Sequence, residues 1–331
     1  MKALFMTSGI KKIDEVYTRS TREKLAEKLD FLEPVTSADQ LAARHDLADA
    51  EIIFSTWGML PLTAEQISAY LPKLKAVFYG AGSVQYFARP FIESGIQVFS
   101  AWAANAVPVA EYTVAQIILA NKGYFQRFHR LPGEPWNNRS FGGYYTGNFG
   151  NKVGLIGVGM IGKLVASMLK VYNLGILAFD PFLSEEKAAE LGVRKVSLET
   201  LFSECTVISN HLANNPQTVG MLNGRLFSLM KPNATFINTG RGAQVVEDDL
   251  IAALEAEPAR VALLDVTMPE PPKPDSKFYT LPNVFLSPHI AGSLGDEVAR
   301  MGDYMAEEFD RWSAGEPTKW GVTLKMLETM A

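Results

Sequence analysis

The sequence predicts an α/β fold made of two doubly wound parallel-sheet domains. Short apolar runs alternate with helical patterns over the first hundred residues, and the same alternation starts again near residue 153. Strands that alternate with helices pair in parallel and are covered by helices on both faces of the sheet. A third observation, a glycine-rich turn at residues 157–162, marks the beginning of the second sheet.

The first half of the chain contains the first alternation. Its strands are expected at residues 3–6, 52–55, 76–79 and 97–99, with a weaker strand near 31–35. Its helices are expected at residues 21–29, 39–45, 63–70 and 83–93. We therefore expect residues 1–102 to form one domain.

A long helical pattern over residues 107–129, with Pro108 suited to its first turn, leads into the second half. Strands are then expected at residues 153–156, 176–179, 206–211, 234–238, 261–265 and 284–286. Helices are expected at residues 160–171, 248–255 and 294–314, among others. We therefore expect residues 103–292 to form a second domain.

Residues 132–150 interrupt the regular pattern with glycine and proline, but this stretch also contains aromatic side chains such as Trp136 and Tyr145. So apolar a loop is not expected to stay solvated. It either packs on its own domain or forms an arm buried against a second subunit, and we favour the arm.

Composition and charge exclude several classes of protein. The chain of 331 residues has a net charge of −5 and lacks the basic stripe of a nucleic-acid binder. The N-terminal apolar run is too short for a signal peptide, and no 18 consecutive apolar residues predict a membrane helix. Cys205 is the only cysteine, which excludes an internal disulfide and favours a buried thiol. We expect a cytoplasmic protein without a metal site, since no two histidines have metal-ligand spacing.

The glycine turn has the G-x-G-x-x-G pattern of a Rossmann dinucleotide site. A strand precedes Gly157, a helix follows Gly162, and a second strand ends at Asp180. Gly157 would permit the tight turn, Gly159 would leave room for a pyrophosphate, and Gly162 would let the helix pack closely on the sheet. The unpaired N–H groups at the helix N-terminus would attract the phosphates.

Asp180 indicates which dinucleotide binds. Its carboxylate would accept hydrogen bonds from the ribose hydroxyls and would repel a 2′-phosphate. Residues 181–186 offer no arginine to such a phosphate. We therefore predict NAD rather than NADP.

Three ionisable residues follow three successive strands of the second half: Arg241, Glu270 and His289. Ligands of α/β sheets bind beyond the carboxyl ends of the strands, so these side chains are expected near the cofactor. Arg241 lies between two glycines, where the backbone can take unusual angles, and an arginine there can bind a carboxylate with two hydrogen bonds.

The residues around this trio resemble the D-isomer-specific 2-hydroxyacid dehydrogenase family. The resemblance covers most of the chain and lies in Asn105–Thr113, the glycine turn, Asn238-Thr239-Gly240-Arg241-Gly242, Asp265 with Glu270, and Ser287-Pro288-His289-Ile290-Ala291-Gly292. It implies a Rossmann NAD-binding domain inserted into a flavodoxin-like substrate-binding domain, to which residues 293–331 return. It also implies a homodimer formed through the NAD-binding domain.

The same resemblance implies roles by position. Arg241 and His289 would bind the substrate, together with backbone N–H groups of the loop that contains Ala81, Gly82 and Ser83. Asp265 would hold the nicotinamide amide. The residues expected to bind the cofactor are Gly157, Gly159, Met160, Ile161, Gly162, Asp180, His211, Thr239, Asp265, His289 and Gly292. The run that begins at His211 departs from the usual family residues at Asn214-Asn215.

In the reaction that the resemblance implies, these residues would reduce a 2-keto acid to a D-2-hydroxy acid. Negative charge builds on the carbonyl oxygen as hydride arrives at C2, and protonated His289 can neutralise it. Glu270 would favour the protonated imidazole and fix its tautomer. Arg241 would hold the substrate carboxylate in both directions of the reaction.

Two other functions are compatible with the same residues. Relatives of the family oxidise formate or phosphite. The family's co-repressor members bind NADH to control assembly with a partner, and such a sensor can retain Arg241, Glu270 and His289.

Overall fold

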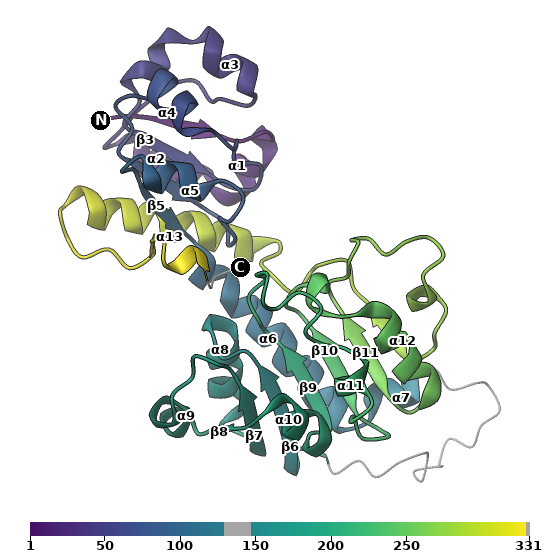
Figure 1. Cartoon of the computed structure of the whole chain (residues 1–331). Coiled ribbons are helices and arrows are strands. Elements are labelled where there is room, and N and C mark those ends of the chain that lie inside the picture. The colour runs from purple at the N-terminus through teal and green to yellow at the C-terminus, as the bar shows by residue number, and fades with distance from the viewer. Residues whose placement is uncertain (129–146, 329–331) are drawn as a thin grey trace. The chain divides into compact units, whose positions relative to one another are not determined.

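The computed structural model describes residues 1–128 and 147–328. Its backbone contacts divide the chain into two compact units, one of residues 1–106 with 293–331 and one of residues 107–292. Each unit is an α/β sheet with helices on both faces, which confirms the predicted fold class (Figure 1). The expected arm at 132–150 lies outside the described residues except for its last few positions.

The first unit contains a six-stranded sheet in the order β13-β5-β4-β3-β1-β2, parallel except for the edge strand β13. Its strands are β1 (Lys2–Met6), β2 (Asp30–Phe31), β3 (Ile52–Ser55), β4 (Ala76–Tyr79), β5 (Gln97–Ser100) and β13 (Gly321–Val322). Its α-helices are α1 (Ile10–Val16), α2 (Arg19–Ala26), α3 (Ala38–Ala43), α4 (Ala64–Tyr70), α5 (Ala88–Glu93) and α13 (Asp296–Ser313).

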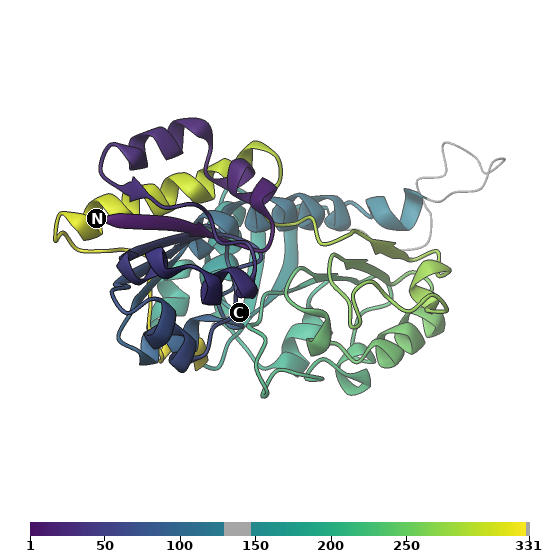
Figure 2. The ribbon, with the colours of Figure 1, turned by 90° about the horizontal axis from the view of Figure 1, so that it is seen from above.

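Successive residues of the central strands point to opposite faces and so supply two cores. On β3, Ile53 packs with α4 and α5, whereas Phe54 packs with α1, α2 and α13. Helix α13 comes from the far end of the sequence but lies beside the N-terminal helices (Figures 1 and 2). A Cβ on Gly302 of α13 would lie 2.0 Å from the carbonyl oxygen of Val16, so the helix approaches that backbone as only glycine allows.

The second unit contains a seven-stranded parallel sheet in the order β12-β11-β10-β9-β6-β7-β8. Its strands are β6 (Phe149–Ile156), β7 (Asn173–Phe179), β8 (Arg194–Lys195), β9 (Val207–Asn210), β10 (Thr235–Asn238), β11 (Val261–Leu264) and β12 (Val284–Leu286). Its α-helices, besides most of α6 (Trp102–Asn121), are α7 (Tyr124–Phe128), α8 (Met160–Leu169), α9 (Glu185–Leu191), α10 (Leu198–Glu204), α11 (Gly224–Phe227) and α12 (Glu247–Ala256).

This sheet is also buried on both faces. On β9, Val207 packs with α6, α8 and α9, whereas Ile208 packs with α10, α11 and α12. Cys205 lies fully buried in the second of these cores, which confirms the expected structural thiol. Burial raises the pKa of that thiol to about 12.

The long helix differs from the prediction. Helix α6 spans Trp102–Asn121, so Pro108 lies inside the helix rather than in its first turn. Proline has no N–H, and the helix therefore lacks one internal hydrogen bond at this point. The earlier start is explained by burial, since Ala103, Ala104 and Ala106 are all buried and add small apolar residues before the proline.

Helix α6 is long and apolar enough by composition to cross a membrane, and it is the one such helix in the part of the chain that the structure describes. A count of consecutive apolar residues misses it because polar residues are scattered along it. Half of its most apolar stretch, 50 %, is buried inside the protein. Its residues Ala110, Ile117 and Ala120 pack in the core of the second unit, as in a core helix of a globular domain.

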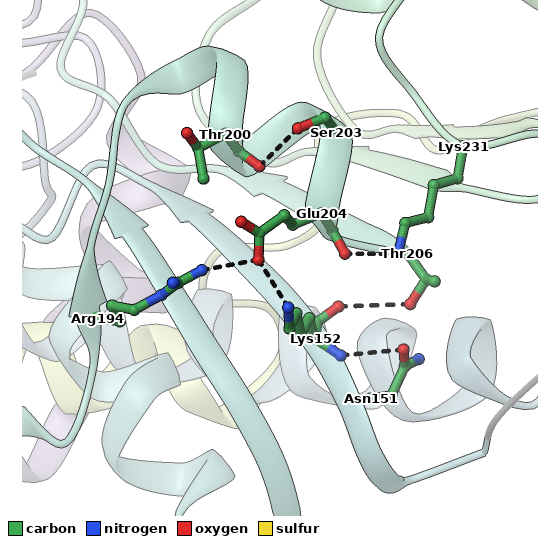
Figure 3. A network of polar contacts seen from close by, with 8 residues as sticks. All are labelled: Asn151, Lys152, Arg194, Thr200, Ser203, Glu204, Thr206 and Lys231. Atoms are coloured by element: carbon green, nitrogen blue, oxygen red, sulfur yellow. Dashed lines mark hydrogen bonds and ion pairs between the residues drawn. The ribbon is translucent and has the colours of Figure 1, made fainter.

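An ion network joins the elements at the amino edge of the second sheet (Figure 3). The Glu204 carboxylate accepts hydrogen bonds from Lys152 Nζ at 2.6 Å and Arg194 Nη2 at 2.7 Å, and its main-chain carbonyl accepts one from Lys231 Nζ at 2.6 Å. The bond from Lys152 lowers the pKa of Glu204. This network lies at the amino ends of the strands, whereas the residues expected to perform chemistry follow the carboxyl ends.

Candidate active site

The glycine turn connects β6 to α8. Gly157 has a φ of 87°, in the left-handed region that glycine adopts without strain. A Cβ on Gly162 would lie 2.2 Å from the Gly157 carbonyl oxygen, so the helix packs against the turn at a distance that excludes any side chain. A Cβ on Gly159 would meet no atom within 4 Å. The space beside Gly159 is therefore open at the N-terminus of a ten-residue helix, and it fits a pyrophosphate group.

Asp180 follows β7 and lies against the same turn. Its Oδ2 accepts a hydrogen bond from the Val158 N–H at 2.8 Å, and its Oδ1 accepts one from the Phe182 N–H at 2.8 Å. Each carboxylate oxygen has a second lone pair, so the residue can still accept bonds from ribose hydroxyls. Asp180 thus stabilises the turn in addition to the role expected from the sequence.

His289 follows β12, and its imidazole contacts Glu270. The distance between His289 Nδ1 and Glu270 Oε1 is 2.6 Å. The two side chains are 49 % and 42 % exposed, so a ligand can reach them. His289 also has a φ of 55°, which makes it the one non-glycine residue with a positive φ within residues 1–128 and 147–328.

Asp265 follows β11 and holds the segment that contains His289. Its carboxylate accepts hydrogen bonds from the Ser287 hydroxyl at 2.6 Å, the Ile290 N–H at 2.8 Å and the Ala291 N–H at 2.9 Å. The Ser287 hydroxyl in turn lies 2.8 Å from the Tyr112 hydroxyl on α6. Asp265 is 3 % exposed and therefore anchors this segment from the interior of the unit.

The role of Tyr112 was missed at the sequence level. Its contact with Ser287 joins residues that are far apart in the chain. No local pattern predicts such a contact.

Arg241 follows β10 between two glycines, but the reason for these glycines differs from the expectation. Neither Gly240 nor Gly242 has a positive φ. A Cβ on Gly242 would lie 2.0 Å from the carbonyl carbon of Thr267, and a Cβ on Gly240 would lie 2.9 Å from Asn210 Nδ2. Close packing, rather than an unusual backbone conformation, therefore requires glycine at both positions.

The guanidinium of Arg241 is partly buried, and its Nη1 donates to the Gly240 carbonyl at 2.8 Å. Burial lowers the pKa of Arg241, while the charge of Glu270 acts in the opposite direction. Arginine nevertheless stays protonated in proteins. Arg241, Glu270 and His289 follow β10, β11 and β12, which are neighbours in the parallel sheet, and Glu270 contacts His289 directly.

His211 follows β9, and its ring lies in the interior. Nε2 is 2.9 Å from the Ser209 hydroxyl, and Nδ1 is 3.4 Å from the hydroxyl of the buried Thr239. Burial lowers the pKa of His211 to about 3, so the ring is neutral at neutral pH. Its backbone carbonyl, by contrast, adjoins the glycine turn, because a Cβ on Gly157 would lie 2.8 Å from it.

The remaining residues expected at the cofactor site lie on the same elements. Met160 and Ile161 form the first turn of α8, where Met160 is 37 % exposed. Gly292 follows Ala291 at the end of the segment that Asp265 anchors. Within the described ranges, no group of three or more His, Cys, Asp and Glu residues could hold a metal ion.

The loop expected to meet the substrate carboxylate lies in the first unit, after β4. The Ser100 hydroxyl contacts the carbonyl oxygens of Ala81 at 2.8 Å and Gly82 at 2.7 Å, which holds the loop in place. The Ala81 N–H donates to the Tyr79 carbonyl at 2.9 Å. That amide is therefore occupied within the loop.

Residues 114–291, more than half of the chain, match the family model of the D-isomer specific 2-hydroxyacid dehydrogenase, NAD binding domain. The chain belongs to this family. The matched segment coincides with most of the second unit, and the cofactor of this domain is NAD.

Curated relatives of this family member are similar over most of its length. The D-3-phosphoglycerate dehydrogenase of Archaeoglobus fulgidus is 29 % identical over 314 residues, which cover 95 % of this chain and 56 % of the relative. The D-3-phosphoglycerate dehydrogenase of Mycobacterium tuberculosis is 32 % identical over 279 residues, which cover 84 % of this chain and 52 % of the relative. The chain thus spans about half the length of the curated relatives it matches.

Solved structures of the family share the fold. A phosphoglycerate oxidoreductase from Rhizobium etli has a TM-score of 0.78 and 25 % identity, covering 98 % of this chain and 99 % of its own. A D-lactate dehydrogenase with NAD+ from Lactobacillus jensenii has a TM-score of 0.76 and 22 % identity, covering 98 % of this chain and 100 % of its own.

Proposed function

We propose that this protein is an NAD-dependent D-2-hydroxyacid dehydrogenase, which interconverts a 2-keto acid and a D-2-hydroxy acid. The observation that supports this function best is the 2.6 Å contact between His289 Nδ1 and Glu270 Oε1, and Arg241 follows the neighbouring strand β10. These residues lie on the same sheet as a glycine turn that fits a pyrophosphate. Family membership supports the same class of reaction.

His289 is the proposed acid and base. Its Nδ1 is occupied by Glu270, so Nε2 is the nitrogen that exchanges a proton with the substrate oxygen at C2. In the reductive direction the protonated ring neutralises the developing charge on the carbonyl oxygen, and in the oxidative direction the neutral ring removes the hydroxyl proton. The Glu270 carboxylate orients the ring through this contact.

Arg241 is the proposed anchor for the substrate carboxylate and carbonyl, because its guanidinium stays charged and can form two parallel hydrogen bonds. We assign the backbone N–H groups of Gly82 and Ser83 as further donors to the carboxylate, with the first unit as the substrate-binding domain. The second unit is the proposed NAD-binding domain. Both assignments rest on the family resemblance together with the loop geometry after β4.

The bound NAD would supply hydride to C2 or accept it from C2. The open space at Gly159 and the amides of Met160 and Ile161 would hold its phosphates, and Asp180 would hold its ribose. Thr239, Asp265, Gly292 and the main chain of His211 would complete the proposed cofactor site. Asp265 has one unoccupied acceptor position on Oδ2 for the nicotinamide amide, because that oxygen accepts one bond, from Ala291.

We also propose a homodimer that forms through the second unit. Its large exposed apolar side chains include Leu119, Tyr124 and Phe149, which is 75 % exposed. A set of asparagine hydrogen bonds joins the end of α6 to residues 148–151, so these side chains lie in one region. A cytoplasmic location is the remaining proposal, supported by a single cysteine that is unpaired and buried.

A substrate panel tests the proposed function. NADH absorbance is followed with glyoxylate, hydroxypyruvate, pyruvate and longer 2-keto acids, and NAD+ reduction is followed with each D- and L-2-hydroxy acid. We expect turnover of at least one 2-keto acid and oxidation of the D-isomer alone.

Two results of this panel would contradict the proposal. Turnover of formate or phosphite with no 2-keto acid active would assign the other dehydrogenase reaction. Tight NADH binding without turnover of any compound, together with an NADH-dependent partner, would assign the sensor function instead.

A further inference from the structure

A buried network of side-chain amides lies beneath Arg241 and has no role in the site as described so far. Its centre is Gln244, in the short turn Gly242–Gln244, and this residue is 0 % exposed. Gln244 Oε1 accepts hydrogen bonds from Asn210 Nδ2 at 2.6 Å and from the Arg241 N–H at 3.2 Å. Gln244 Nε2 donates to the carbonyl oxygens of Leu212 at 2.9 Å and Ala213 at 2.9 Å. Every hydrogen-bonding position of this amide is therefore used.

Two asparagines extend the network to both sides of Arg241. Asn210 Nδ2 also donates to Asn238 Oδ1 at 3.0 Å, and that oxygen accepts the Gly240 N–H at 3.1 Å. Asn238 Nδ2 donates to the Arg241 carbonyl at 3.2 Å. The backbone of Arg241 is thus held at its N–H by Gln244 and at its carbonyl by Asn238, and both asparagines are buried.

The other end of the network reaches the cofactor side. Gln244 holds the carbonyls of Leu212 and Ala213, and Asn210 Oδ1 accepts the Leu212 N–H at 3.3 Å. This segment adjoins the glycine turn, since a Cβ on Gly157 would lie 2.9 Å from the Leu212 nitrogen. Gln244 therefore joins the turn that carries Arg241 to the segment that borders the glycine turn.

We propose that Gln244 is a positioning residue that fixes the Arg241 backbone relative to the cofactor segment at residues 211–213. The proposal deepens the proposed function and rests on it for the role of Arg241. Only an amide satisfies the network, because it must accept two bonds and donate two at once. An ionised glutamate accepts but cannot donate, so it would face the carbonyls of Leu212 and Ala213 with like partial charge.

The test compares Gln244→Glu with Gln217→Glu in the full-length protein. Gln217 is exposed in the same unit, so its substitution makes the same change of side chain outside the network. Two quantities are measured for each variant: the Kd for NADH by fluorescence titration, and kcat and KM for the best 2-keto acid. We expect Gln244→Glu to raise the KM for the keto acid about tenfold to a hundredfold, because a small displacement of an anchoring group has effects of that size.

The remaining expectations separate positioning from simple loss of structure. The Kd for NADH should rise several-fold in Gln244→Glu, while Gln217→Glu should match the wild type in both quantities. If Gln244→Glu does not fold, Gln244→Met is used, because it keeps the length of the side chain but removes both donors and the acceptor. It should show the same two changes in the folded protein.

Folded Gln244 variants with KM and Kd both within about twofold of the wild type, which is under 0.5 kcal/mol, would overturn the proposal even if their unfolding temperature fell. If the wild type itself reduces no 2-keto acid, the proposed dehydrogenase function fails. The NADH titration then decides the link between Gln244 and the cofactor segment alone: a raised Kd upholds it, and an unchanged Kd refutes it.

Discussion

At the scale of single residues, the backbone conformation of His289 determines where the proposed acid and base lies. His289 has a φ of 55°, a conformation that costs a residue with a side chain about 1–2 kcal/mol. The Asp265 carboxylate offsets this strain by accepting the N–H groups of Ile290 and Ala291 and the hydroxyl of Ser287. The turn at His289, held by Asp265, thus carries the imidazole that contacts Glu270.

The buried ring of His211 predicts how stability depends on pH. Burial lowers its folded pKa to about 3, whereas an unfolded histidine titrates near about 6.5. As pH falls from about 6.5 toward 3, the unfolded chain binds a proton that the folded chain does not, so about 1.4 kcal/mol is lost per pH unit. His211→Gln should remove this loss. The free energy of unfolding, measured with urea by far-UV circular dichroism, should fall about 2 kcal/mol less between pH 7 and pH 5 than in the wild type.

The matched control for this prediction is His45→Gln. His45 is exposed in the first unit, so its substitution should leave the pH dependence as it is in the wild type. An identical loss of stability in wild type and His211→Gln would show that the ring of His211 is not the group that resists protonation.

At the scale of elements, two glycines of the turn between β6 and α8 have different surroundings. Gly159 lies in open space at the N-terminus of α8, whereas Gly162 lies against the backbone of Gly157. The two glycines belong to the same motif but serve different purposes: Gly159 leaves room for the phosphates, and Gly162 allows the helix to pack.

This difference predicts that the same substitution impairs NADH binding at Gly159 and folding stability at Gly162. Gly159→Ala should raise the Kd for NADH by about tenfold, or roughly 1.4 kcal/mol, with at most about 1 kcal/mol lost from folding stability. Gly162→Ala should cost about 3 kcal/mol of stability, since its Cβ would lie 2.2 Å from the Gly157 carbonyl oxygen. Urea unfolding and NADH titration of both variants check this, and equal effects of the two on stability would contradict it.

The elements that the sequence predicted best are those whose signal is local. The strands at 52–55 and 76–79 match β3 and β4, and the turn at Gly157 matches its expected geometry. Pro108 was misplaced because proline is common in the first turn of a helix and rare inside one, so the usual preference gave the wrong start.

The amide network at Gln244 could not be predicted at all. Its contacts join Gln244 to Asn210, 34 positions apart in the sequence. A single polar residue at the end of a strand does not indicate which distant residue it will bind. The departure at Asn214-Asn215 was visible, but its consequence was not. The structure shows that Asn215 Oδ1 accepts the N–H groups of Gln217 and Thr218 and so closes a local turn.

At the scale of the whole molecule, the chain divides into two units with separate cores. Arg241, Glu270, His289 and the glycine turn all lie in the second unit, whereas the loop with Gly82 lies in the first. The composition of the chain did not predict the division into two units. The order of the strands and the family resemblance predicted that Arg241, Glu270 and His289 lie at one edge of a sheet, because the carboxyl ends of neighbouring parallel strands bring distant residues together.

The turnover of His289→Ala with NADH and the best 2-keto acid tests the central claim most directly. The same assay is run with the wild type and with His45→Ala, which replaces an exposed histidine in the first unit. We predict a loss in kcat of about 100- to 10,000-fold for His289→Ala, the range for removal of a general acid, while the variant still binds NADH. Wild-type turnover by His289→Ala would contradict the account, because His289 would then not be the acid and base of the reaction.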